Sequence, residues 1–65
     1  MSAQTTLAKA YVVTKQYEKA LELASNWKDI KPDDSKPYLL AGDVYVRQQK
    51  FEKAKVEFEK ASEID

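Results

Sequence analysis

An internal repeat with a period of 34 residues constrains this sequence more than any other feature. Residues 16–20, with the sequence QYEKA, align with residues 50–54, KFEKA. In the same register Tyr11 aligns with Tyr45, and Ala8 stands opposite Gly42. A fixed period of this length is the signature of stacked supersecondary units. The chain is therefore predicted to fold as two copies of one small unit.

Apolar residues recur within each copy at intervals of three and four, the spacing of one face of an α-helix. Tight turns are expected at residues 15–16 and 49–50, and a longer break at 31–34, where Pro32 stops the preceding helix. One helix should run from about residue 36 to residue 48, with Ser35 as its N-cap. The sequence thus predicts four helices and an all-α fold. In the first copy the apolar series is Leu7, Ala8, Tyr11, Tyr17, Ala20, Leu21, Ala24, Trp27 and Ile30.

The second copy resembles the tetratricopeptide repeat, whose pattern is a Trp, Leu-Gly, a Tyr, a later Ala, an aromatic residue and Pro. Its matching residues are Tyr38, Ala41, Gly42, Tyr45, Ala54 and Phe58. The first copy matches more loosely, through Gln4, Leu7, Ala8, Tyr11, Ala20, Ala24 and Pro32. The resemblance covers the whole chain and implies an α-solenoid fragment of two helix-turn-helix hairpins with four antiparallel helices. Residues 1–34 and 35–65 would be the two repeats of one domain.

The last residues, Ile64 and Asp65, stand where the family would continue with Pro and another helix. The second repeat is thus expected to lack its final Pro and any capping helix. Since terminal repeats need an outer face that tolerates solvent, we expect the last helix to expose apolar surface. This favours an alternative role, a structural segment of a longer scaffold that self-associates through its uncapped end as a homo-oligomer.

Packing explains most of the conspicuous residues. Small residues are expected to let paired helices approach closely, with aromatic residues filling the space beside them: Ala8, Ala20, Gly42 and Ala54, then Tyr11, Tyr17, Tyr45 and Phe51. Trp27 is assigned to the same core, with a role as a groove anchor as the alternative. Lys53 with Glu57, and Lys55 with Glu59, have the spacing of ion pairs on the wet face of a helix.

Composition excludes several classes of function. The chain has no His and no Cys, so it lacks the commonest general base, the strongest nucleophile and the usual zinc ligands. We therefore predict no enzyme activity, no metal and no cofactor. The 11 basic residues are balanced by 11 acidic ones, which argues against binding nucleic acid. No apolar stretch approaches the roughly 20 residues of a membrane span, and no signal peptide is recognised at the start. The chain is expected to be soluble, in an undetermined compartment.

The resemblance implies a binding function. In this family the first helices of successive repeats line a concave surface that usually binds an extended peptide or a partner helix. The residues expected on that surface are Lys9, Val12, Val13, Lys36, Leu39, Asp43, Val46 and Arg47. A simpler reading of two of the charges is that Lys9 and Asp43 pair with each other. Binding of chaperone C-termini is not expected, because Thr5, Lys9 and Leu40 fall where that clamp uses a lysine and two asparagines.

Overall fold

Within the residues that the structure describes, the chain forms four α-helices, as the sequence predicts. The structure is a computed structural model that describes the backbone of residues 3–64 and the side chains of residues 6–64. The outer limits predicted for the repeats, residues 1 and 65, lie outside these ranges. None of the described helices is long and apolar enough to cross a bilayer. The helices are α1 (Ala3–Val13), α2 (Tyr17–Ile30), α3 (Lys36–Arg47) and α4 (Phe51–Ile64).

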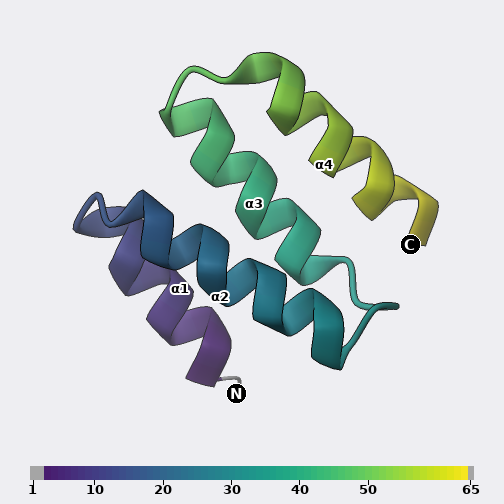
Figure 1. The fold of residues 1–65 in the computed structure, drawn as a ribbon, viewed down its shortest axis with the longest axis horizontal. Helices are drawn as coiled ribbons and strands as arrows, with labels where there is room; N and C mark the ends of the chain where they lie inside the picture. The colour runs from purple at the N-terminus through teal and green to yellow at the C-terminus, as the bar shows by residue number, and fades with distance from the viewer. Residues whose placement is uncertain (1–2, 65) are drawn as a thin grey trace.

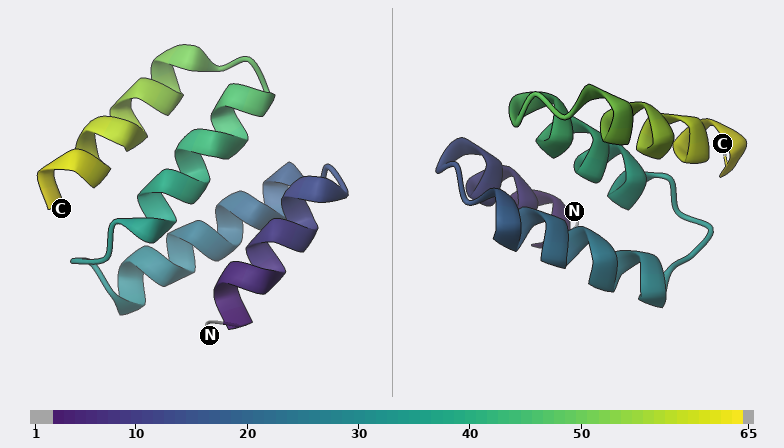
Figure 2. Two further views of the ribbon diagram at one scale, coloured as in Figure 1. Left: turned by 180° about the vertical axis from the view of Figure 1, so that it is seen from behind. Right: turned by 45° about the horizontal axis from the view of Figure 1, so that its top comes forward.

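The helices are arranged in space in the order in which they occur in the sequence (Figure 1). α1 packs antiparallel on α2, and α3 packs antiparallel on α4, so each pair forms a hairpin. A further contact between α2 and α3 joins the hairpins, which the two views of Figure 2 also show. α1 and α4 therefore lie at opposite ends of the array.

Both hairpins turn through the same local structure. Lys15 and Gln49 each adopt a left-handed backbone conformation with φ of 62°. In the first turn the N–H of Gln16 donates to the carbonyl of Tyr11 at 2.7 Å, and the equivalent bond closes the second turn at 2.8 Å. Such bonds satisfy carbonyl groups that a helix C-terminus leaves without a donor. The tight turns predicted within each repeat are confirmed.

Asp34 lies just before α3 and links the start of this helix to α2 through two hydrogen bonds. Its Oδ1 atom accepts the backbone N–H of Lys36 at 3.0 Å, and its Oδ2 atom accepts the indole N–H of Trp27 at 3.1 Å. Ser35, the predicted N-cap, has helical backbone angles and makes no capping bond with its side chain. The predicted N-cap position is confirmed, but the side chain that accepts a free N–H of the helix is the carboxylate of the preceding residue, Asp34.

The core lies where the two hairpins meet. Val12 of α1, Ala20 of α2 and Val44 of α3 are buried together, and partly buried side chains surround them: Tyr11, Tyr17, Leu21 and Leu40. The small residues expected at close helix contacts are all buried: Ala8, Ala20, Gly42 and Ala54. Phe51 is an exception to the predicted core, because 62% of it is exposed. Its counterpart Tyr17 packs against the core cluster where α2 meets α3.

A charged bridge spans the two repeats. Lys28 of α2 places its Nζ atom 2.7 Å from Oε1 of Glu57 in α4, and their side chains are only 24% and 13% exposed. The same ammonium lies 4.4 Å from the ring centroid of Tyr38 in α3. The local pairing expected between Glu57 and Lys53 is therefore wrong. Among the described residues, Lys55 and Glu59 form no ion pair either. The carboxylate of Glu57 finds a more enclosed partner across the repeat boundary.

Candidate interaction groove

A groove between α1 and α3 brings together the predicted binding residues except Val46. Its volume is about 360 Å³. α1 contributes Lys9, Val12 and Val13, while α3 contributes Lys36, Leu39, Asp43 and Arg47. The sequence series lines one surface because α1 and α3 occupy equivalent places in the two hairpins. The remaining lining residues are Ala8, Trp27 and Leu40. That these side chains bind a partner stays a prediction.

The apolar residues of the groove differ sharply in exposure. Val12 and Trp27 are 6% and 4% exposed, so they form its floor and belong to the packed interior. Val13 and Leu39 are 75% and 47% exposed and stand on opposite walls. Covering exposed apolar surface is favourable by roughly 25 cal/mol per Å². Val13 and Leu39 are therefore the apolar contacts that a ligand could gain, whereas Val12 supports the floor.

The charged side chains of the groove are mainly basic. Lys9, Lys36 and Arg47 line it together with one acid, Asp43. Arg47 donates from Nε to Oδ2 of Asp43 at 3.3 Å, with both side chains 51% exposed. The alternative reading, in which Lys9 pairs with Asp43, is thus wrong, because Asp43 pairs with Arg47 one turn along its own helix. The groove carries an excess of positive charge, although the chain as a whole is neutral.

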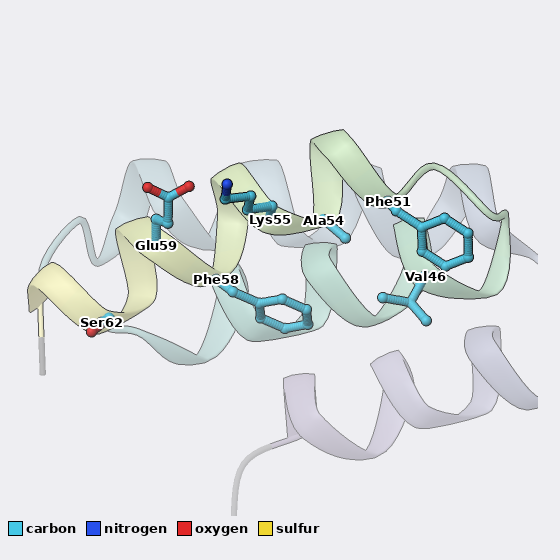
Figure 3. A pocket seen from close by; sticks show the side chains of 7 residues that line it. All are labelled: Val46, Phe51, Ala54, Lys55, Phe58, Glu59 and Ser62. Atoms are coloured by element: carbon cyan, nitrogen blue, oxygen red, sulfur yellow. The ribbon is translucent and has the colours of Figure 1, made fainter.

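Val46 lies on a different surface from the other predicted residues. It lines a hollow on the outer side of the second hairpin with Phe51 and Phe58 of α4, as Figure 3 shows. The equivalent residue in the first repeat, Val12, is enclosed because α3 packs beside it. Among the described residues no helix covers the equivalent place on the second hairpin, and Val46 is 40% exposed. Val46 does occupy the position in its repeat that Val12 occupies in the first, but the prediction that it lines the groove is wrong.

Trp27 lines the groove although the sequence pattern assigned it to the core, with a role as a groove anchor only as the alternative. Its counterpart 34 residues later is Ala61, which favours a helix contact over a ligand contact. In the structure Trp27 is buried, as expected for a core residue, and it also lines the floor of the groove between α1 and α3. The side chain of Thr5 lies outside the described residues.

The chemistry that the groove offers follows from its polar side chains. Its polar side chains are ammonium, guanidinium and carboxylate groups, which can pair with charges on a partner. Within the part of the chain that the structure describes, no group of three or more acidic residues could hold a metal ion. The exposed apolar side chains Val13 and Leu39 line the same groove as the basic side chains, so this surface offers both apolar and ionic contacts.

Comparison with known proteins identifies the second hairpin. Residues 35–65 match the family model for the tetratricopeptide repeat, and this segment contains α3 and α4. The arrangement of all four described helices as two similar hairpins is consistent with the same family. No curated protein and no solved structure gives a significant match to the chain.

Proposed function

Because the chain belongs to the tetratricopeptide repeat family, we propose that it binds a peptide or a partner helix in the groove between α1 and α3. Repeats of this family are generally protein–protein interaction modules. The observation that carries the proposal is the joint placement of Val13 and Leu39, two exposed apolar side chains from different repeats, in one groove.

The charges of the groove indicate the chemistry of the partner. Lys9 and Lys36 belong to none of the ion pairs found among the described residues. Arg47 pairs with Asp43, but its side chain is 51% exposed and accessible to a ligand. Acidic side chains on a ligand would find these cations close to the apolar walls. We therefore expect a segment that carries large apolar residues flanked by Asp or Glu.

Three absences are part of the proposal. The family is a non-catalytic interaction repeat, and this sequence has no His and no Cys, so we propose that the chain catalyses no reaction and holds no cofactor. Its equal numbers of basic and acidic residues support a protein partner over nucleic acid.

Selection from a random library of 16-residue peptides displayed on phage tests the groove. Selected peptides should be enriched in Asp, Glu and large apolar residues. They should bind a Val13→Glu variant about tenfold more weakly or worse, because the change places a carboxylate on the apolar wall.

The matched control is Val56→Glu, at a 48% exposed valine of α4 that does not line the groove. This variant should bind the selected peptides as the parent chain does. Failure to select any peptide, or selected peptides that bind the Val13→Glu variant undiminished, would contradict the proposal.

A structural role in a longer scaffold is the second candidate. It is favoured by the exposed apolar residues on α4 and at the end of α3, Phe51, Phe58 and Val46. If this role is the correct one, the peptide selection should yield no groove binder.

A further inference from the structure

The hollow on the second hairpin corresponds, in the 34-residue register, to the surface of the first hairpin on which α3 packs. In the 34-residue register, Val46, Phe51 and Phe58 correspond to Val12, Tyr17 and Ala24. The first set is 40%, 62% and 40% exposed, whereas Val12 and Ala24 are 6% and 1% exposed. The difference arises because α3 packs on the first hairpin at this place.

The same register identifies the surface that could cover this hollow. α3 contacts the first hairpin through Val44, which is fully buried in the core cluster. Its counterpart on α1 is Ala10, which is exposed, and next to it Leu7 is 43% exposed. α1 therefore exposes the helix face that corresponds to the face of α3 buried against the first hairpin.

We propose that copies of this chain associate head to tail, with α1 of one copy packing on the hollow of the next copy in the way that α3 packs on α2. The occupant is a second copy because the chain supplies both halves of the contact at opposite ends of its array (Figure 1). This contact is heterologous, so it continues from copy to copy and does not close a two-fold dimer. It is separate from the peptide groove and goes beyond the proposed function.

One residue limits the strength of this contact. Leu21, which packs against the core cluster where the hairpins meet, corresponds to Lys55 in the hollow (Figure 3). A lysine there must keep its ammonium in water while its methylene groups contact the neighbour. The contact between copies is therefore weaker than the internal one, and association depends on concentration.

Sedimentation velocity over a range of concentrations tests the proposal, with circular dichroism to confirm that each variant is helical. The parent chain should sediment progressively faster as its concentration rises. Ala10→Glu and Phe51→Glu each place a carboxylate on one half of the contact at an exposed position, so each variant alone should remain monomeric. An equimolar mixture of the two variants retains one intact contact and should form a dimer that grows no further.

A matched control and a strengthening variant complete the test. Val56→Glu changes an exposed valine of α4 that lies outside the hollow, and this variant should associate as the parent does. Lys55→Leu restores the internal residue and should strengthen association about tenfold, and adding Ala10→Glu should abolish that gain. A parent chain that stays monomeric at millimolar concentration would overturn the proposal. Self-association of the Ala10→Glu variant would also overturn it, because it indicates pairing of α4 with α4.

Discussion

The ring of Phe58 occupies the space that a side chain at Gly42 would need. A Cβ atom added at Gly42 would lie 2.6 Å from Cε1 of Phe58, well inside contact distance. In the 34-residue register the corresponding pair in the first repeat is Ala8 and Ala24. A small residue on α4 would remove the need for glycine on α3, so the two positions form a coupled pair in each repeat.

This coupling predicts opposite effects of Gly42→Ala in two backgrounds. Alanine in a helix is normally more stable than glycine by about 0.5 to 1 kcal/mol. With Phe58 present, the new methyl group must displace the ring, and overpacking of about 1 to 3 kcal/mol outweighs that gain. Urea denaturation should show lower stability for Gly42→Ala alone. In the Phe58→Ala background the same change should raise stability, and equal effects in both backgrounds would refute the coupling.

The bridge between Lys28 and Glu57 should contribute measurably to the joining of the repeats. Both side chains are mostly enclosed, and Lys28 also contacts the ring of Tyr38. A double-mutant cycle with Lys28→Met and Glu57→Gln should give a coupling free energy of about 1 kcal/mol in urea denaturation.

Arg47 and Asp43 provide the matched comparison for that cycle. They are four residues apart on one helix, and each side chain is 51% exposed. Their coupling should not exceed about 0.5 kcal/mol, and 1 M salt should remove most of it. A larger coupling for this exposed pair than for the bridge would contradict the interpretation of Lys28 as the link between repeats.

Glycine should stabilise both hairpin turns at the residues with positive φ. Lys15 and Gln49 hold a left-handed conformation that is unfavourable for residues with a Cβ atom. Lys15→Gly and Gln49→Gly should each raise the free energy of unfolding by about 0.5 to 1 kcal/mol, measured by thermal or urea denaturation. Lys50→Gly, one residue beyond the second of these positions, should not stabilise the protein. Destabilisation by both of the first two changes would show that these turns do not adopt the described conformation in solution.

The carboxylate of Asp34 should contribute more to the free energy of unfolding than that of Asp33. It accepts hydrogen bonds from both the N–H of Lys36 and the indole of Trp27. Asp34→Ala should lower the free energy of unfolding by about 1 to 2 kcal/mol, whereas Asp33→Ala at an exposed position should change it by less than about 0.5 kcal/mol. Equal effects of the two substitutions in urea denaturation would exclude the double role of Asp34.

The repeat period and the helical spacing predicted the four helices and both tight turns, because these depend on local sequence. The spacing could not predict which polar partners meet across the repeat boundary. Glu57 has a lysine at the right spacing on its own helix, yet it bonds Lys28 because the fold brings the side chain of Lys28 on α2 within reach of α4. Ser35 likewise has a good capping side chain, but the carboxylate of Asp34 accepts the N–H of Lys36 and also accepts the indole N–H of Trp27 from α2.

The sequence predicted most, but not all, of the residues that line the groove. Equivalence of the two first helices identified Val13 and Leu39 from opposite walls, and the structure places both in one groove. The same equivalence failed for Val46, because what covers a repeat position depends on the element that packs next to it. The sequence offered core and groove anchor as alternatives for Trp27, and its small counterpart Ala61 favoured the core; the structure places it in the core and in the groove floor.

Mapping a bound peptide by NMR tests the proposed binding site most directly. The ¹⁵N-labelled chain would be titrated with the tightest peptide from the phage selection. Amide shifts should concentrate on the groove, around Val13, Leu39 and Arg47, and should be lost in the Val13→Glu variant. Shifts confined to the α4 surface around Phe51, or persisting unchanged in that variant, would contradict binding between α1 and α3.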